Sequence, residues 1–201
     1  MEITDIIGNT KIILATNSPR RKELLEQLGL HFELRTKVVD ESYPISFRAE
    51  AVAVYIAEKK ANSFLNTIKD ELLIAADTVV AIDDEIFGKP TDEQDAKRML
   101  KRLSGKNHEV ITGVALLFNG KIYSFFEKTT VYFRELSEAE IDYYIHHYQP
   151  YDKAGSYGIQ EWIGLIGVSK IEGSYNNVVG LPTSRLYHEI GSFLQQSKSL
   201  P

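Results

Sequence analysis

Two long β-rich runs joined by an Asn-Gly dipeptide constrain the fold of this chain more than any other feature. The runs are His108–Phe118 and Lys121–Phe133, and Asn119-Gly120 lies between them. Asn-Gly is typical of the two-residue turns that connect antiparallel strands. We therefore expect a sheet that contains a long antiparallel hairpin.

Shorter strands and helices alternate along the rest of the chain. Strands are expected at Lys11–Thr16, Phe32–Val38, Glu71–Ala76 and Val79–Ile82. Helices are expected from Pro19 to about Leu28, and at Phe47–Leu65, Thr91–Leu103, Ser137–Tyr148 and Leu181–Leu194. Alternation of strands and helices, together with the hairpin, predicts an α/β fold with a mixed, twisted central sheet.

Local signals mark the first residues of several helices. Ser18 is a good N-cap and Pro19 suits the first helical position. Thr91 is expected to cap a second helix, and Ser137 with Glu140 indicates the capping box of a third. The stretch from residue 151 to residue 180 is rich in glycine and is expected to be irregular.

The composition limits both the number of domains and the compartment. No repeat, low-complexity tract or linker occurs, so residues 1–201 are expected to form a single domain. The chain has no cysteine, which excludes disulfides and thiolate metal sites and fits a reducing compartment. The first ten residues lack the pattern of a signal peptide, and the apolar runs are far shorter than the roughly 20 residues that span a bilayer. We therefore expect a cytoplasmic protein without a membrane partner.

The charge of the chain argues against a nucleic-acid polymer as its partner. There are 23 Lys and Arg residues against 28 Asp and Glu residues, which gives a formal net charge of −5. No basic block dominates the sequence, whereas proteins that bind nucleic acids usually carry one. A small anionic ligand, held by a few placed cations, stays possible.

The segment Ser18-Pro19-Arg20-Arg21 is a candidate phosphate site. It lies at a strand-to-helix junction, where free backbone N–H groups and the helix dipole attract phosphate. Two arginines are electrostatically disfavoured in the first turn of a helix, so their presence there favours an anion as ligand. The alternative is a solvated surface turn.

Two further segments carry charged residues where a ligand could bind. Ala76-Asp77-Thr78 is expected at the end of a buried strand, and acidic residues in that position often face the ligand crevice of an open α/β sheet. The alternative is an aspartate that caps a turn. In Phe87-Gly88-Lys89-Pro90, Lys89 lies on a constrained turn able to aim its ammonium at a phosphate, although this segment is not a Walker A loop.

The glycine-rich stretch and the histidines are less specific. Tyr151–Gln160 mixes glycines with aromatic residues, which suggests a backbone shaped around a ligand or simply a loop-rich lobe. His146 and His147 are adjacent and diverge on a helix, so they are expected on the surface, and His108 is expected to be structural. No HExxH or GxSxG motif supports a metalloprotease or a serine hydrolase.

Taken together, the motifs resemble the Maf family of nucleotide pyrophosphatases. They occur in the order and at the spacing of that family and cover nearly the whole chain. The matching segments are residues 14–25, Ala76–Val80, Gly88–Pro90, Leu103–Gly105, His108, Val110, Thr112–Val114, Asp152–Gly155, Tyr157, Ile159, Gln160, Gly173–Tyr175 and Val178–Pro182.

This resemblance implies an elongated, two-lobed α/β protein with a cleft, similar to the inosine-triphosphate pyrophosphatase fold. It also implies a divalent metal cation (Mg²⁺ or Mn²⁺), hydrolysis of nucleoside triphosphates with release of pyrophosphate, and a possible homodimer. Gly158-Ile159-Gln160 looks like the dTTP/UTP branch, because the branch that acts on 7-methyl-GTP typically has a glutamate there. The sequence departs from the family at Thr16-Asn17 and at Glu161-Trp162, where many members have glycine after the glutamine.

The resemblance also assigns roles to individual residues. Asp77 is expected to orient or deprotonate the attacking water and to bind metal. Glu41 is expected to be a second metal ligand or helper, the alternative being an ordinary loop acid. The remaining residues are expected to contact the substrate. Those expected to bind the phosphates are Ser18, Arg21, Lys60 and Lys89, and those linked to substrate selectivity are Arg20, Thr78 and Gln160. Only the family match favours Lys60 over its neighbour Lys59.

Gln160 has a chemical reason to select pyrimidines. Uracil and thymine present an N–H donor beside a carbonyl acceptor, and a primary amide offers the complementary acceptor and donor. Three alternatives stay open. They are a non-catalytic nucleotide-binding regulator of septum formation, a 7-methyl-GTP or purine pyrophosphatase, and an α/β domain without a nucleotide role.

Overall fold

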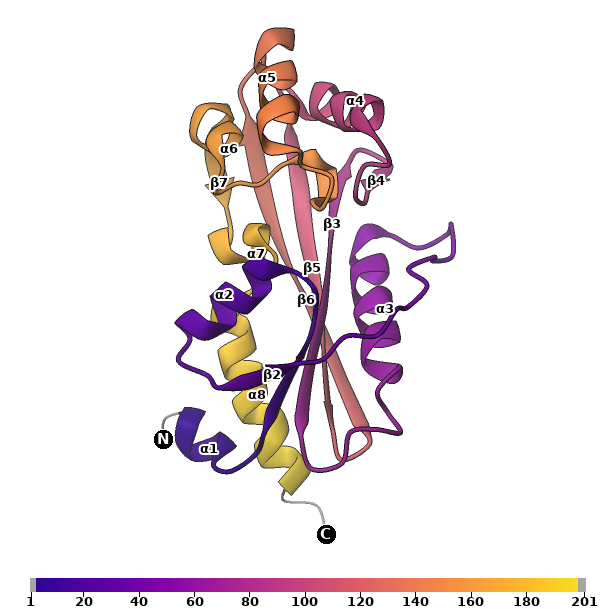
Figure 1. Cartoon of the computed structure of the whole chain (residues 1–201), viewed down its shortest axis with the longest axis vertical. Helices are drawn as coiled ribbons and strands as arrows, with labels where there is room; N and C mark the ends of the chain where they lie inside the picture. The colour runs from indigo at the N-terminus through magenta and orange to yellow at the C-terminus, as the bar shows by residue number, and fades with distance from the viewer. Residues whose placement is uncertain (1–2, 199–201) are drawn as a thin grey trace. The chain divides into compact units, whose positions relative to one another are not determined.

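The computed structural model describes residues 3–198, whose path is drawn in Figure 1. The strands are β1 (Ile12–Ala15), β2 (Phe32–Leu34), β3 (Leu72–Ile82), β4 (Glu85–Phe87), β5 (Asn107–Phe118), β6 (Lys121–Phe133) and β7 (Val168–Glu172). The helices are α1 (Ile3–Ile7), α2 (Pro19–Gln27), α3 (Ala49–Asn62), α4 (Glu93–Leu103), α5 (Glu138–Tyr148), the 3₁₀ turn η1 (Ala154–Ser156), α6 (Trp162–Gly167), α7 (Tyr175–Val179) and α8 (Thr183–Lys198). Within these residues, no helix is both long and apolar enough to cross a membrane.

The strands form one mixed sheet, which confirms the predicted fold class. Their order is β2-β1-β3-β5-β6-β7, and β4 pairs with β3 outside this path. β1 runs parallel to both β2 and β3, whereas β3 with β4 and β6 with β7 are antiparallel. Asn119 and Gly120 join β5 to β6 with φ angles of 49° and 71°, the left-handed conformation that a tight hairpin turn requires.

The chain divides into two compact units. The first comprises Met1–Asp77, Thr112–Glu127 and Gly180–Pro201, and the second comprises Thr78–Ile111 and Lys128–Val179. The single domain with two lobes that was expected for residues 1–201 stays a prediction. The cleft that the family resemblance implies stays a prediction.

Each unit has its own apolar core. In the first unit, small residues on α3 (Ala57 and Ala61) pack with apolar residues of β1, β3 and β5, so the helix lies close to the sheet. In Figure 1, α3 lies on one side of these strands, and α2 and α8 lie on the other. In the second unit, α4, α5 and α6 cover a core that includes Leu100, Val131 and Tyr144.

The predicted strand end at Ala76-Asp77-Thr78 is wrong. β3 continues without a break from Leu72 to Ile82. Its pairing partner changes along its length: β1 pairs with it as far as Ala75, and β4 pairs with Val80 to Ile82. Asp77 and Thr78 interrupt the apolar pattern because they lie beyond the end of β1, not because the strand stops.

Two other predictions about local structure are corrected. The N-cap of α4 is Asp92, whose carboxylate accepts from the Asp95 N–H at 2.8 Å, and not Thr91. Thr91 instead donates its own backbone N–H to the Asp95 carboxylate at 3.1 Å. The stretch 151–180 is not irregular, since it contains η1, α6, β7 and α7, each too short for periodicity to reveal.

Candidate functional site

The start of α2 has the geometry of an anion site. Ser18 has an extended backbone and caps the helix, with its Oγ accepting from the Arg21 N–H at 3.5 Å. Pro19 occupies the first turn, and no acidic residue offsets the positive end of the helix dipole there. Arg20 lies close enough to Arg21 for their charges to interact. This arrangement supports the predicted phosphate-binding role of the helix end.

Arg21 is bonded to three separate segments of the first unit. Its Nε donates to the Gly180 carbonyl at 2.8 Å, and its Nη1 donates to the Ala76 carbonyl at 2.9 Å and to Thr16 Oγ1 at 3.5 Å. Burial lowers the pKa of Arg21, and the negative charge of Asp77 opposes that change. The guanidinium of Arg21, in the first turn of α2, therefore links the residue after β1 (Thr16) with β3 (Ala76) and with the loop before α8 (Gly180). These bonds hold whether or not Arg21 also contacts a ligand.

Lys60 brings two predicted acidic residues together. Its Nζ lies 2.6 Å from Asp77 Oδ1 and 2.8 Å from Glu41 Oε1. The side chains of Lys60 and Asp77 are 18% and 13% exposed, whereas that of Glu41, on the loop before α3, is 46% exposed. These three charged side chains are only partly covered by protein. Their remaining exposed surface is accessible to a ligand.

The structure separates Lys60 from its neighbour Lys59. Lys59 turns to the loop, where its Nζ lies 3.2 Å from Asp40 and 3.1 Å from the Ser42 carbonyl. Hydrogen bonds from Ser42, and then from Lys59, lower the pKa of Asp40 to about 2. Of the two lysines, Lys60 is therefore the one beside Asp77, as the family match indicated.

Gly113 determines how closely α3 approaches the sheet, and sequence reasoning gave it no role. A Cβ at this position would lie 2.3 Å from the carbonyl carbon and oxygen of Ala53 on α3. Real Cβ atoms do not come so close to backbone atoms, so only glycine fits. α3 carries Lys60 near its end, and Gly113 thus contributes to the position of that side chain. The signal in the sequence was a glycine inside a long strand pattern.

The second unit contains the other three predicted residues. Lys89 is exposed and follows Gly88, whose carbonyl accepts from the Gly155 N–H at 3.1 Å. Gln160 is exposed on a turn closed by a hydrogen bond from the Glu161 N–H to the Gly158 carbonyl at 3.0 Å. The glycine-rich segment therefore supports both the turn that carries Lys89 and the turn that carries Gln160.

Thr78 directly follows Asp77 within β3. Successive side chains of a strand point to opposite faces of the sheet, so the hydroxyl of Thr78 and the carboxylate of Asp77 face opposite ways. The predicted link of Thr78 to selectivity stays a prediction.

The carboxylate oxygens beside Lys60 are of the kind that binds a hard metal cation. Among the described residues there is no group of three or more His, Cys, Asp or Glu side chains arranged for a metal ion. Asp77 and Glu41 nevertheless direct one carboxylate oxygen each at the same point, the Lys60 ammonium. Mg²⁺ is commonly bound by one or two carboxylates together with substrate phosphates and water, so two converging carboxylates fit such an ion.

The histidines have the places that were predicted for them. His108 is 2% exposed, and its Nε2 lies 2.7 Å from the hydroxyl of Tyr157. Its ring also packs edge-on against Phe133 at a centroid distance of 5.1 Å. His146 and His147 are exposed on α5. His108 is therefore structural, and the other two are surface residues.

A charged network in the second unit was missed altogether. The Lys153 ammonium, only 8% exposed, lies 3.1 Å from Glu161 Oε1 and 2.7 Å from Asp152 Oδ1. The hydroxyl of the buried Tyr144 donates to Glu161 Oε2. The sequence analysis singled out Asp152–Gly155 as a family match and Glu161-Trp162 as a departure from the family, but neither segment indicated these partners.

Comparisons with known proteins agree with the resemblance. The model of the Maf-like protein family matches residues 11–193. A protein of Phocaeicola vulgatus named dTTP/UTP pyrophosphatase is 57% identical over 182 residues, which cover 90% of this chain and 94% of the relative. Proteins with the same name are 47% identical in Cytophaga hutchinsonii (92% of this chain, 84% of the relative) and in Porphyromonas gingivalis (94% and 97%).

Among solved structures, the structure of a HAM1 protein from Coxiella burnetii aligns with this protein over 93% of this chain and 99% of the HAM1 chain. Its sequence identity is 12% and its TM-score is 0.45.

Proposed function

This chain belongs to the Maf family, and from that membership we propose that it hydrolyses dTTP and UTP to the monophosphate and pyrophosphate. The observation in the structure that carries the chemistry is the convergence of Asp77 and Glu41 on Lys60. The trio lies in the same unit as the phosphate-binding start of α2, and Arg21 interacts with the charges of both acids. The proposal places the protein in the cytoplasm, with its nucleotide substrates.

Asp77 is the proposed general base. In the reaction, a water oxygen attacks the α-phosphorus, the bond to the oxygen that bridges the α- and β-phosphates breaks, and pyrophosphate leaves. The water proton passes to a carboxylate within hydrogen-bond reach. Lys60 donates to Asp77 Oδ1 and fixes the orientation of that carboxylate, which leaves the other oxygen, Oδ2, as the proton acceptor.

Cationic residues of the chain neutralise the triphosphate. We assign this role to Arg20 and Arg21, with the N–H groups of the helix start behind Ser18, to Lys60, and to the exposed Lys89 of the second unit. Charge on the phosphate oxygens grows or shifts during phosphoryl transfer, and fixed cations stabilise it in the transition state. Each such contact contributes roughly a tenfold to a thousandfold in rate.

Asp77 and Glu41 are the proposed ligands of a divalent cation, Mg²⁺ or Mn²⁺. When bound, such a cation supplies positive charge to the phosphate oxygens. Asp77 and Glu41 would hold this cation, and both carboxylates also contact the ammonium of Lys60. The site therefore combines positive groups for the phosphates with a carboxylate for the water.

Gln160 is the proposed reader of the base. Gln160 is exposed, so its amide is accessible to a ligand. An amide pairs with the adjacent carbonyl and N–H of uracil or thymine. Selection of dTTP and UTP over purine nucleotides rests on this pairing.

The decisive experiment measures pyrophosphate release from dTTP, UTP, dCTP, GTP and 7-methyl-GTP with Mg²⁺ or Mn²⁺. Wild type is compared with Asp77→Asn, which keeps the shape of the side chain but loses the base. Asp84→Asn serves as the control because Asp84 is exposed in the β3–β4 turn. We expect hydrolysis of dTTP and UTP by wild type and the control, and loss of about a hundredfold or more in Asp77→Asn.

Each alternative function has its own outcome in that panel. Preferential turnover of GTP or 7-methyl-GTP would establish a purine pyrophosphatase and refute the role of Gln160. Binding of dTTP without release of pyrophosphate under either metal would establish a non-catalytic regulator. The proposed homodimer is tested separately, by sedimentation of the purified protein.

A further inference from the structure

The hydroxyl of Tyr144 holds both ends of the turn that carries Gln160. This turn is closed by the hydrogen bond from the Glu161 N–H to the Gly158 carbonyl, with Ile159 and Gln160 at its centre. The hydroxyl accepts from the Gly158 N–H at 3.0 Å and donates to the Glu161 carboxylate. One side-chain atom on α5 therefore fixes the first and the last residue of the turn.

Glu161 is held from its other side by a buried cation. Its Oε1 lies 3.1 Å from Lys153 Nζ, and both side chains are mostly covered, at 20% and 8% exposed. Glu161 is the N-cap residue of α6, yet its carboxylate makes no capping bond to that helix. The carboxylate points instead into the network of Tyr144 and Lys153. Both oxygens of this carboxylate thus have a partner, the Tyr144 hydroxyl for Oε2 and the Lys153 ammonium for Oε1, and a fully satisfied buried network of this kind is rigid.

The turn is also packed tightly against this network. A Cβ on Gly158 would lie 2.8 Å from the carboxyl carbon of Glu161, so any side chain there would displace this carboxylate from the network. Ile159 is 5% exposed and anchors the turn in the core of the second unit. Gln160, between these fixed residues, is exposed.

We propose that Tyr144, Glu161 and Lys153 are positioning residues for substrate selectivity, because they fix the turn that presents the Gln160 amide to the pyrimidine base. The proposal rests on the proposed function, in which Gln160 reads the base. Recognition by two hydrogen bonds requires the amide to be held within a few tenths of an ångström, and a loose turn would reach the base only part of the time. The network acts on binding of the base and not on the reacting phosphorus.

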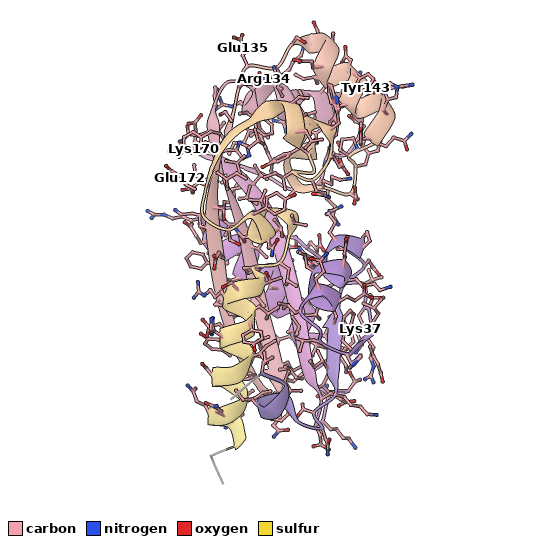
Figure 2. All side chains as sticks on the ribbon, turned by 90° about the vertical axis from the view of Figure 1, so that its left-hand side faces the viewer. Lys37, Arg134, Glu135, Tyr143, Lys170 and Glu172 are labelled. Atoms are coloured by element: carbon pink, nitrogen blue, oxygen red, sulfur yellow. The ribbon has the colours of Figure 1, made fainter. Side chains whose placement is uncertain are left out.

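Tyr144→Phe removes the hydroxyl and leaves the packed ring. The matched control is Tyr143→Phe, the same change one residue earlier on α5. Tyr143 lies on the outer side of the helix, as Figure 2 shows, and is 45% exposed. A second variant, Glu161→Gln, keeps an acceptor for the Tyr144 hydroxyl but removes the charge that faces Lys153. Each variant is measured for kcat and KM on dTTP, UTP and GTP, and for its unfolding temperature.

We expect Tyr144→Phe and Glu161→Gln to raise KM for dTTP and UTP about tenfold, with kcat changed less than about twofold, because uniform binding is lost. The ratio of kcat/KM for dTTP over GTP falls by the same factor, and Tyr143→Phe behaves as wild type. In a Gln160→Ala background, Tyr144→Phe has no further effect on KM, since the network acts through Gln160.

Other results overturn the proposal. An equal loss of kcat/KM on all three nucleotides, or a lower unfolding temperature with unchanged selectivity, would mean that the network is only structural. An additive effect in the Gln160→Ala background would show that Tyr144 does not act through Gln160. A wild-type protein inactive on dTTP and UTP would instead refute the proposed function, which distinguishes the two failures.

Discussion

Lys60 Nζ lies 2.6 Å from Asp77 Oδ1, although one residue is near the end of α3 and the other is in the middle of β3. The contact exists because α3 lies directly against the sheet, where its alanines and Gly113 allow a close approach. It pairs the proposed base with a cation inside a site that must also accept an anionic substrate. In the proposed function, the ammonium of Lys60 orients the carboxylate and offsets part of the charge on the phosphates.

Lys60→Met should lower kcat/KM on dTTP by about a hundredfold to a thousandfold. The change removes a phosphate contact and also the ammonium that Asp77 and Glu41 both contact. Lys59→Met is the matched control, because Lys59 contacts the exposed Asp40 and not Asp77. Steady-state pyrophosphate release measures both variants. Equal losses in the two lysine variants would contradict the role assigned to Lys60.

Gln160→Glu should lower kcat/KM for dTTP and UTP by about tenfold. The carboxylate keeps an acceptor but loses the N–H donor that pairs with the carbonyl of the base, and the missing hydrogen bond costs about 1 kcal/mol or more. Gln94→Glu introduces the same change at an exposed position of α4 and should leave both rates unaltered. The substrate panel checks this prediction, and unchanged kinetics on both pyrimidine nucleotides would refute the assignment.

Features that depend on neighbouring residues in the sequence could be predicted without the structure. The Ser18 cap, the Asn119-Gly120 hairpin and the capping box of Ser137 and Glu140 are of this kind, and all three are confirmed. Each arises from a side chain that bonds to a backbone group a few residues away, or from a backbone angle that few residues adopt. The sequence patterns also predicted the strands β1, β5 and β6 and the helices α2, α3, α4, α5 and α8 with approximate bounds, whereas α1, β4, α6, β7 and α7 were not predicted.

Features that depend on distant partners could not be predicted. The sequence pattern predicts a strand end at Asp77, because this polar side chain breaks the apolar run. Only the pairing of β3 with β4 shows that the strand continues. The Lys153–Glu161 pair and the Tyr144 hydroxyl are joined by tertiary structure across the second unit. The N-cap of α4 was predicted one residue too early because Thr91 and Asp92 are both residue types that cap helices. In the structure the Asp95 N–H donates to the Asp92 carboxylate, which makes Asp92 the cap.

Gly113→Ala should destabilise the protein by about 2–3 kcal/mol or more. The added methyl group would lie 2.3 Å from the backbone of Ala53, and backbone atoms of a helix cannot move aside as a side chain can. Gly191→Ala is the control, since a methyl group there meets only the flexible end of Ile6 at 3.3 Å and improves helix propensity in α8. Urea denaturation measures both, and similar midpoints for the two variants would contradict the proposed close contact of α3 with β5.

The stability of the protein should depend on pH through His108. Burial lowers the pKa of His108 from 6.5 to about 4, and within the described residues its Nδ1 has no hydrogen-bond partner. Between these two values, the unfolded chain binds a proton that the folded chain does not, so stability falls as pH decreases. The loss begins near pH 6.5 and reaches about 3 kcal/mol near pH 4, and His108 contributes no pH dependence above that range.

Urea midpoints of wild type and His108→Gln at pH 7.5, 6 and 5 test this prediction. Glutamine can still bond to the Tyr157 hydroxyl but does not titrate, so the variant should lose less stability than wild type as the pH is lowered. His146→Gln, at an exposed position of α5, should follow the wild-type curve. If wild type and His108→Gln lose stability in parallel from pH 7.5 to 5, the buried imidazole is not the source of the acid sensitivity, because the two chains differ only in that titrating group.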